Sequence, residues 1–83
     1  MTRTELHDRL QDGFAAVFPR LSRAEIATAD HQTVPEWDSL ASVTLLAMLQ
    51  QEFQIDAEFT ELDRFQSFSA TLSFLEEKIP VEQ

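Results

Sequence analysis

Apolar residues recur along this chain every three or four positions, which is the period of a helix with one buried face. In the first such run, Thr2 and Glu5 have the spacing of a capping box, so a helix is predicted to begin there. The apolar positions that follow are Leu6, Leu10, Phe14 and Val17. Pro19 lacks a backbone donor and is predicted to end this helix.

Three more helices are predicted downstream. The second covers about Ser39 to Phe53. Its apolar stripe is Leu40, Val43, Leu46, Leu49 and Phe53. A short third helix includes Leu62, ends near Phe65 and has Thr60 and Asp63 as capping residues. Ser67 is predicted to cap the last helix, whose stripe ends before Pro80. That stripe is Phe68, Leu72, Leu75 and Ile79.

A long connection, residues 19–37, is predicted between the first two helices. Leu21, Ile26 and Val34 are expected to pin it to the core. No strand pattern or repeat is present. The predicted fold is therefore all-α, a small four-helix bundle of three longer helices and a short third one, with the long loop between helices one and two. Residues 1–83 are expected to form one domain.

Composition narrows the class of protein. The chain has 83 residues, 43% of them hydrophobic, with one glycine and no cysteine. A disulfide framework and a cysteine metal site are therefore excluded. The N-terminal residues lack the apolar run of a signal peptide, and no stretch has transmembrane length. We expect a cytoplasmic monomer that does not associate with membranes.

The net charge of −9 lies entirely in the later part of the chain. Residues 1–25 carry four acids and four arginines, whereas residues 26–83 carry eleven acids and two bases. Such a surface repels the phosphates of nucleic acids and of anionic lipids. It favours partners with basic patches, although acidity also serves simply to keep a small protein soluble.

Side chains that could perform catalysis are few and scattered. His7 and His31 are far apart in sequence and lack the neighbours of a metal site, so both are interpreted as surface residues. There is no glycine-rich phosphate loop and no nucleophile with an evident base. The sequence therefore predicts no catalytic residue, no metal site and no enzyme.

Ser39 stands out in the segment EWDSLASVTLL, residues 36–46. It lies between Asp38 and Leu40, where the second helix is predicted to begin, and the single tryptophan stands two residues earlier. One interpretation is purely structural: Asp38 caps the helix and Ser39 is its first residue. The other is that the hydroxyl is a point of covalent attachment.

The whole frame resembles the acyl carrier protein family. The family's attachment motif, Asp-Ser-Leu at the start of helix two, is found here as Asp38-Ser39-Leu40. The segment LLAMLQQEFQID, residues 45–56, is similar to the family's helix-two ending. The aromatic-rich last helix also matches. The resemblance implies that Ser39 carries a 4′-phosphopantetheine arm, which a magnesium-dependent phosphopantetheinyl transferase adds from coenzyme A.

That resemblance also implies a function and its partners. The arm would hold an acyl or aminoacyl group as a thioester, loaded by a ligase or transferase and presented to synthase enzymes. Glu36 and Trp37 stand where carriers of general fatty-acid synthesis have a glycine and a small residue. The chain therefore looks like a free-standing carrier of a specialised pathway. The alternative is a small acidic helical adaptor without a prosthetic group.

Partner contacts are expected around the second and third helices. The second helix carries one charge, Glu52, and offers an uncharged face beside the attachment serine. Leu40 is expected to turn inward and fix the start of this helix while bordering the face. The predicted partner-binding residues are Leu40, Ala41, Thr44, Met48, Glu61 and Asp63. We expect enzymes of fatty-acid synthesis to use such a face poorly, because steering by charge is weak there.

Overall fold

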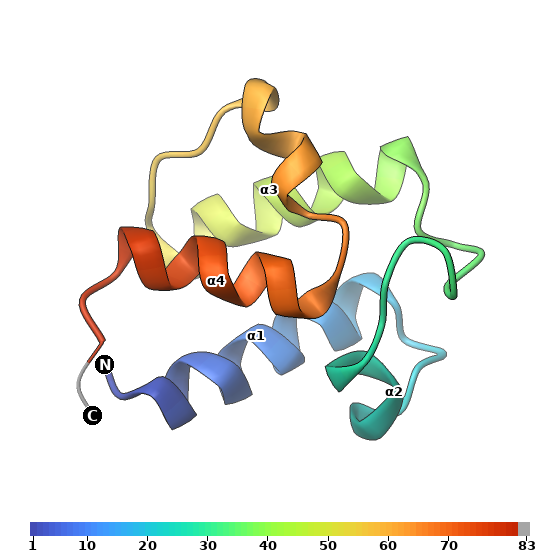
Figure 1. Ribbon diagram of the computed structural model, residues 1–83, viewed down its shortest axis with the longest axis horizontal. Coiled ribbons are helices and arrows are strands. Elements are labelled where there is room, and N and C mark those ends of the chain that lie inside the picture. The colour runs from blue at the N-terminus through green and yellow to red at the C-terminus, as the bar shows by residue number, and fades with distance from the viewer. Residues whose placement is uncertain (82–83) are drawn as a thin grey trace.

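A computed structural model describes residues 1–81 and shows five helices in that range (Figure 1). They are α1 (Arg3–Val17), α2 (Arg23–Ala27), α3 (Ser39–Phe53), the 3-10 helix η1 (Phe59–Arg64) and α4 (Phe68–Lys78). No strand lies within residues 1–81, so the prediction of a small all-α bundle is confirmed. Within the same range, no helix has the length and apolarity needed to cross a bilayer.

The three longer helices, α1, α3 and α4, lie roughly along the long axis of the molecule. In Figure 1, α1 runs from left to right, whereas α3 and α4 run in the opposite direction. Helix α2 lies beside the end of α1, and η1 contacts both α3 and α4. The N-terminus and the end of α4 lie at the same end of the molecule.

Local capping signals account for most helix starts. The Glu5 N–H donates to Thr2 Oγ1 at 3.1 Å, and the Thr2 N–H donates to Glu5 Oε1 at 3.3 Å. This is the predicted capping box of α1. Ser67 caps α4, as predicted, by accepting the Ala70 N–H at 2.9 Å. Helix α1 ends before Pro19 and α4 ends before Pro80.

Two local expectations were wrong. The connection between α1 and α3 is not loop throughout, because α2 forms within it on a capping box of Ser22 and Glu25. Helix η1 begins after Glu58, whose N–H donates to Glu61 Oε1 at 3.1 Å, and not on the predicted pair of Thr60 and Asp63. In both places an acidic side chain reaches back to the residue that precedes the helix.

The core collects side chains from every helix except η1, with Phe65 just beyond it. On α3, Leu45, Leu46, Leu49 and Phe53 are buried, whereas Leu40 and Val43 of the predicted stripe are exposed. On α4, Phe68, Thr71, Phe74 and Leu75 are buried, whereas Leu72 and Ile79 are only half-buried. Both buried faces are therefore rotated relative to the predicted stripes, because each helix is covered from two sides.

Arginines of the early chain form hydrogen bonds with residues of the later chain. Arg3 binds Glu76 of α4 at 2.9 Å, and Arg9 donates to the Glu52 carbonyl at the end of α3 at 2.8 Å. These contacts lie at the surface, so each stabilises the fold only weakly. They nevertheless join elements that are remote in sequence.

Candidate functional site

Ser39 is the first residue of α3 and is exposed. The carboxylate of Asp38 accepts the Ala41 N–H at 2.9 Å, and its carbonyl accepts the Ser42 N–H at 3.0 Å. Within residues 1–81, neither the hydroxyl of Ser39 nor the N–H groups of Ser39 and Leu40 have a hydrogen-bond partner. The site therefore presents a free hydroxyl beside unsatisfied donors at the positive end of a helix.

The loop before α3 is held to the linker before α4. The His31 N–H donates to the Gln66 carbonyl at 3.0 Å, and the Phe68 N–H donates to the Ala29 carbonyl at 3.0 Å. The carboxylate of Asp30 accepts the N–H groups of Gln32 and Thr33 at 2.7 and 2.9 Å. These backbone donors lower the pKa of Asp30. The pairing brings His31 and Gln66 together near the start of α3.

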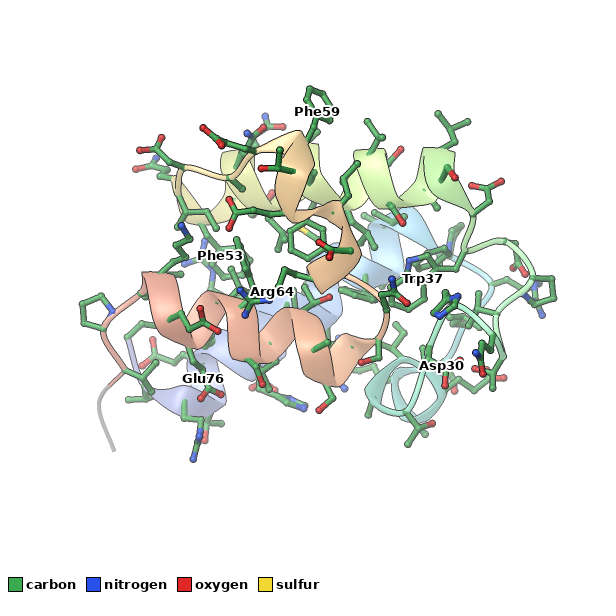
Figure 2. The ribbon with its side chains drawn as sticks, turned by 45° about the horizontal axis from the view of Figure 1, so that its top comes forward. Asp30, Trp37, Phe53, Phe59, Arg64 and Glu76 are labelled. Carbon is green, nitrogen blue, oxygen red and sulfur yellow. The ribbon has the colours of Figure 1, made fainter. Side chains whose placement is uncertain are left out.

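Trp37 lies inside the molecule at the joint between this loop and α3 (Figure 2). Its ring centroid is 5.4 Å from that of Phe14 and 5.3 Å from that of Phe18. Its backbone N–H donates to the Val34 carbonyl at 3.0 Å. Trp37 is only 4% exposed, yet its indole Nε1–H has no hydrogen-bond partner among the described residues. Most buried polar groups in proteins do have one.

A pocket of about 250 Å³ opens beside Ser39. Its lining residues are His31, Trp37, Asp38, Ser39, Ser42, Leu62, Phe65 and Gln66. Ser42 follows Ser39 by about one helical turn, so its place in the pocket lining could have been predicted from the sequence. No sequence signal indicated His31 or Gln66, because they reach the pocket only through the pairing of two loops. Both hydroxyl and amide groups thus surround the candidate attachment point.

His31 and Ser39 both line this pocket. No hydrogen bond joins them within residues 1–81. The nearby carboxylates of Asp30 and Asp38 are occupied by backbone N–H groups and do not orient the imidazole. A serine nucleophile needs such a hydrogen-bonded chain to be activated. His7 lies elsewhere, with its ring 5.2 Å from that of Phe68. Residues 1–81 contain no group of three potential metal ligands.

The predicted docking face has a more apolar edge than expected. Leu40 is 73% exposed and does not turn inward, because Trp37 already fills the core at the start of α3. Phe59 of η1 is 69% exposed and projects away from the body of the molecule in Figure 2. Thr44 is exposed and its hydroxyl donates to the Leu40 carbonyl at 3.0 Å, whereas Ala41 is half-buried against the core.

Met48 contributes less to this face than predicted. It is half-buried, and its thioether packs over Gly13 of α1. A Cβ atom built on Gly13 would lie 2.5 Å from Met48 Sδ. Much of Met48 therefore belongs to the packing between α1 and α3, and the absence of a side chain at Gly13 makes room for it.

The predicted acidic contacts lie on η1, beside the apolar edge. Asp63 is exposed, whereas Glu61 is half-buried and binds the Glu58 N–H and, at 3.9 Å, Lys78 Nζ. The carboxylate of Glu61 is thus partly neutralised within the protein, while that of Asp63 is accessible. The electrostatic part of any docking would depend more on Asp63 and its exposed neighbours Asp56 and Glu58.

No protein-family model, curated protein or solved structure matches the chain.

Proposed function

We propose that this protein is an acyl carrier, in which Ser39 bears a 4′-phosphopantetheine arm. The observation that carries the proposal is the exposed Ser39 hydroxyl, free of any internal hydrogen bond within residues 1–81, at the start of the 15-residue helix α3. Capping is already performed by Asp38, so the helix start does not require the serine hydroxyl. The site also fits the sequence resemblance to acyl carrier proteins.

The residues present suit such a group. A phosphodiester on Ser39 would lie next to the N–H groups of Ser39 and Leu40, which have no partner within residues 1–81, and there the helix dipole favours an anion. The pocket beside Ser39 leaves room for the atoms that follow. When bound, the arm supplies a terminal thiol, which is the group needed to hold a thioester in a chain without cysteine.

Attachment is a phosphoryl-group transfer. The Ser39 oxygen attacks the phosphorus of coenzyme A that carries the pantetheine, and a new phosphorus–oxygen bond forms. The bond to the other phosphate breaks, so adenosine 3′,5′-bisphosphate leaves. The hydroxyl proton passes to a base on the transferase, and magnesium on that enzyme neutralises the developing charge. This chain contributes the accessible hydroxyl and the helix terminus.

Loading partners and synthases then meet the cargo on a tether. A tether raises the effective concentration of the cargo at each enzyme and keeps intermediates from diffusing away. The carrier needs no catalytic residue of its own. Leu40 and Phe59 offer exposed apolar contacts, and Asp63 offers charge, on the side of the molecule formed by α3 and η1.

The proposal is tested by intact-mass measurement. The purified chain is incubated with coenzyme A, magnesium and a broad-specificity phosphopantetheinyl transferase. We expect the mass to increase by one phosphopantetheinyl group, and Ser39→Ala to gain nothing while keeping its helical circular dichroism. Ser42→Ala is the matched control, because it removes a neighbouring hydroxyl and should still be loaded. An unchanged mass with several active transferases would favour the alternative of an adaptor, which the exposed Leu40 and Phe59 also suit.

A further inference from the structure

The exposed large apolar side chains within residues 1–81 all lie on α3 and η1. Leu40 is 73% exposed, Val43 37% and Phe59 69%. Val43 follows Leu40 by about one turn of α3, and Ala47, which is also exposed, follows by about one turn more. Phe59 begins η1, which contacts α3, and it projects away from the body of the molecule in Figure 2. We call these four residues the apolar strip.

The fold does not need the apolar strip. Asp38 caps α3, Trp37 fills the core at the start of this helix, and Leu46 and Leu49 anchor its length. Polar side chains at the strip positions would leave those contacts in place and make the surface more soluble. Apolar side chains that gather on one side of a molecule, bordered by charged ones, mark an interaction site.

The charge around Phe59 is negative and not compensated. The exposed acids on either side of it in the sequence are Asp56, Glu58 and Asp63. None of the three forms a salt bridge within residues 1–81. The two bases of the later chain are engaged elsewhere, because Arg64 binds Glu77 and Lys78 lies 3.9 Å from Glu61. A partner with positive charge beside its apolar contacts would therefore be complementary.

These features favour a basic helix over other occupants. A second copy of the chain would bring two acidic margins together, and nucleic acids or anionic lipids would be repelled by the same acids. An extended peptide adds to the edge of a sheet, and residues 1–81 contain no strand. The row from Leu40 to Ala47 covers about two turns, or about 10 Å along α3, and a second helix packs along such a row.

We propose that the apolar strip binds an amphipathic helix of a partner protein, one that carries lysine or arginine beside its apolar face. Leucine-like side chains of that helix pack against Leu40, Val43 and Ala47, and Phe59 inserts between them. The basic side chains at the margin meet the acids around Phe59. The interaction makes no use of the Ser39 hydroxyl, so it goes beyond the carrier function and does not require the arm.

A synthetic helical peptide tests the proposal. It has leucine at positions i, i+3, i+4 and i+7 and lysine elsewhere, and its binding to the full chain is followed by fluorescence anisotropy. We expect binding that weakens by about tenfold in Phe59→Ala and in Leu40→Ala, the effect of losing one apolar anchor, and that weakens as salt is added. Exposed Ser73 of α4 provides the control, because Ser73→Ala lies outside the strip and should bind as the wild type does.

Two results would overturn the inference. One is equal binding by the wild type, Phe59→Ala and Leu40→Ala, which would reveal charge attraction without a docking site. The other is equally tight binding of a peptide in which glutamate replaces lysine. Circular dichroism verifies that the variants are folded, and chemical-shift changes in the wild type, expected to concentrate on α3 and η1, decide the matter without any variant.

The same experiment separates this inference from the carrier function. Ser39→Ala should bind the peptide as the wild type does, although it cannot be loaded. Loading of the wild type without peptide binding refutes the inference and leaves the carrier function intact. Peptide binding without loading refutes the carrier function instead. A dimer of the chain that Phe59→Ala dissociates would assign the strip to a second copy and overturn the inference.

Discussion

The guanidinium of Arg20 binds both carboxylate oxygens of Glu36, with nitrogen–oxygen distances of 2.7 Å each. The pair joins the loop after α1 to the residues that directly precede the Asp38-Ser39-Leu40 segment. A bidentate pair restricts both side chains more than a single contact does. The hydrogen bond from Arg20 lowers the pKa of Glu36.

This pair predicts a dependence of stability on pH. A lowered pKa in the folded state means that the pair contributes stability above the ordinary glutamate pKa of about 4.3, and that the contribution is lost as the pH falls through the lower folded value. Glu36→Gln should therefore unfold at a lower denaturant concentration than the wild type near neutral pH, by a small margin because both groups are exposed. The difference should vanish in strong acid.

Urea unfolding near neutral pH and in strong acid measures the coupling energy between Arg20 and Glu36. The four proteins compared are the wild type, Arg20→Gln, Glu36→Gln and the double variant. Additive effects of the two single changes at neutral pH would show that the pair does not stabilise the fold.

Leu40 is predicted to be a contact for the transferase and not a part of the core. Because its side chain is 73% exposed, Leu40→Ala should change the free energy of unfolding by less than about 0.5 kcal/mol. Its position next to Ser39 should make the kcat/KM of loading fall by about five- to tenfold, the effect of losing one apolar anchor. Gln51→Ala removes an exposed side chain from the other end of α3 and is the control. Equal losses for both variants would contradict a specific contact at Leu40.

The uncharged outer face of α3 predicts poor use by enzymes of fatty-acid synthesis. Thr44 and Ala47 are exposed on this helix, so Thr44→Glu with Ala47→Glu adds charge without disturbing the core. Acyl transfer from a fatty-acid transacylase should improve in this variant at low salt, and the gain should shrink at high salt as the charges are screened. Thr44→Gln with Ala47→Gln is the neutral control. Efficient transfer to the unmodified chain would refute the prediction.

Gly13 and Met48 are predicted to be energetically coupled. Alanine in place of a glycine inside a helix gains up to about 1 kcal/mol. In the wild type the new Cβ would lie 2.5 Å from Met48 Sδ, so the thioether must move and part of the gain is lost. Gly13→Ala should therefore stabilise the Met48→Ala protein more than it stabilises the wild type. Thermal unfolding of the four proteins gives the coupling, and equal gains in both backgrounds would contradict it.

Leu49 is predicted to be among the most sensitive positions of α3. It is fully buried, and Leu49→Ala should cost about 2–5 kcal/mol. That is a large share of the roughly 5–15 kcal/mol that stabilises a domain. Exposed Gln51 is the control, with a change below about 0.5 kcal/mol. Gln50→Ala should fall between them, because its amide donates to the Ala57 carbonyl at 2.7 Å. Equal urea midpoints for all three variants would show that α3 packs differently.

Local chemistry in the sequence determined where most helices begin and end. Capping residues and prolines act on backbone groups only a few residues away, so their effect can be predicted without knowing the fold. The examples here are the capping box of Thr2 and Glu5, the caps at Asp38 and Ser67, and Pro19. The capping box of Ser22 and Glu25 is equally local, and it could have indicated α2. A five-residue helix has too few apolar positions to show periodicity, which is why the pattern alone predicted a loop.

The tertiary structure decided which residues of each helix are buried and what surrounds Ser39. Leu40 and Leu45 are both compatible with a helical stripe, and only the placement of α1, Trp37 and η1 around α3 exposes the first and buries the second. The same holds for the pocket. Asp38 and Ser39 could be placed at the start of α3 from the sequence. His31 and Gln66 line the pocket only because backbone hydrogen bonds join two loops that are remote along the chain. Long-range pairing and the satisfaction of buried donors depend on the whole packing, so no local pattern could reveal that the Trp37 indole N–H has no partner within residues 1–81.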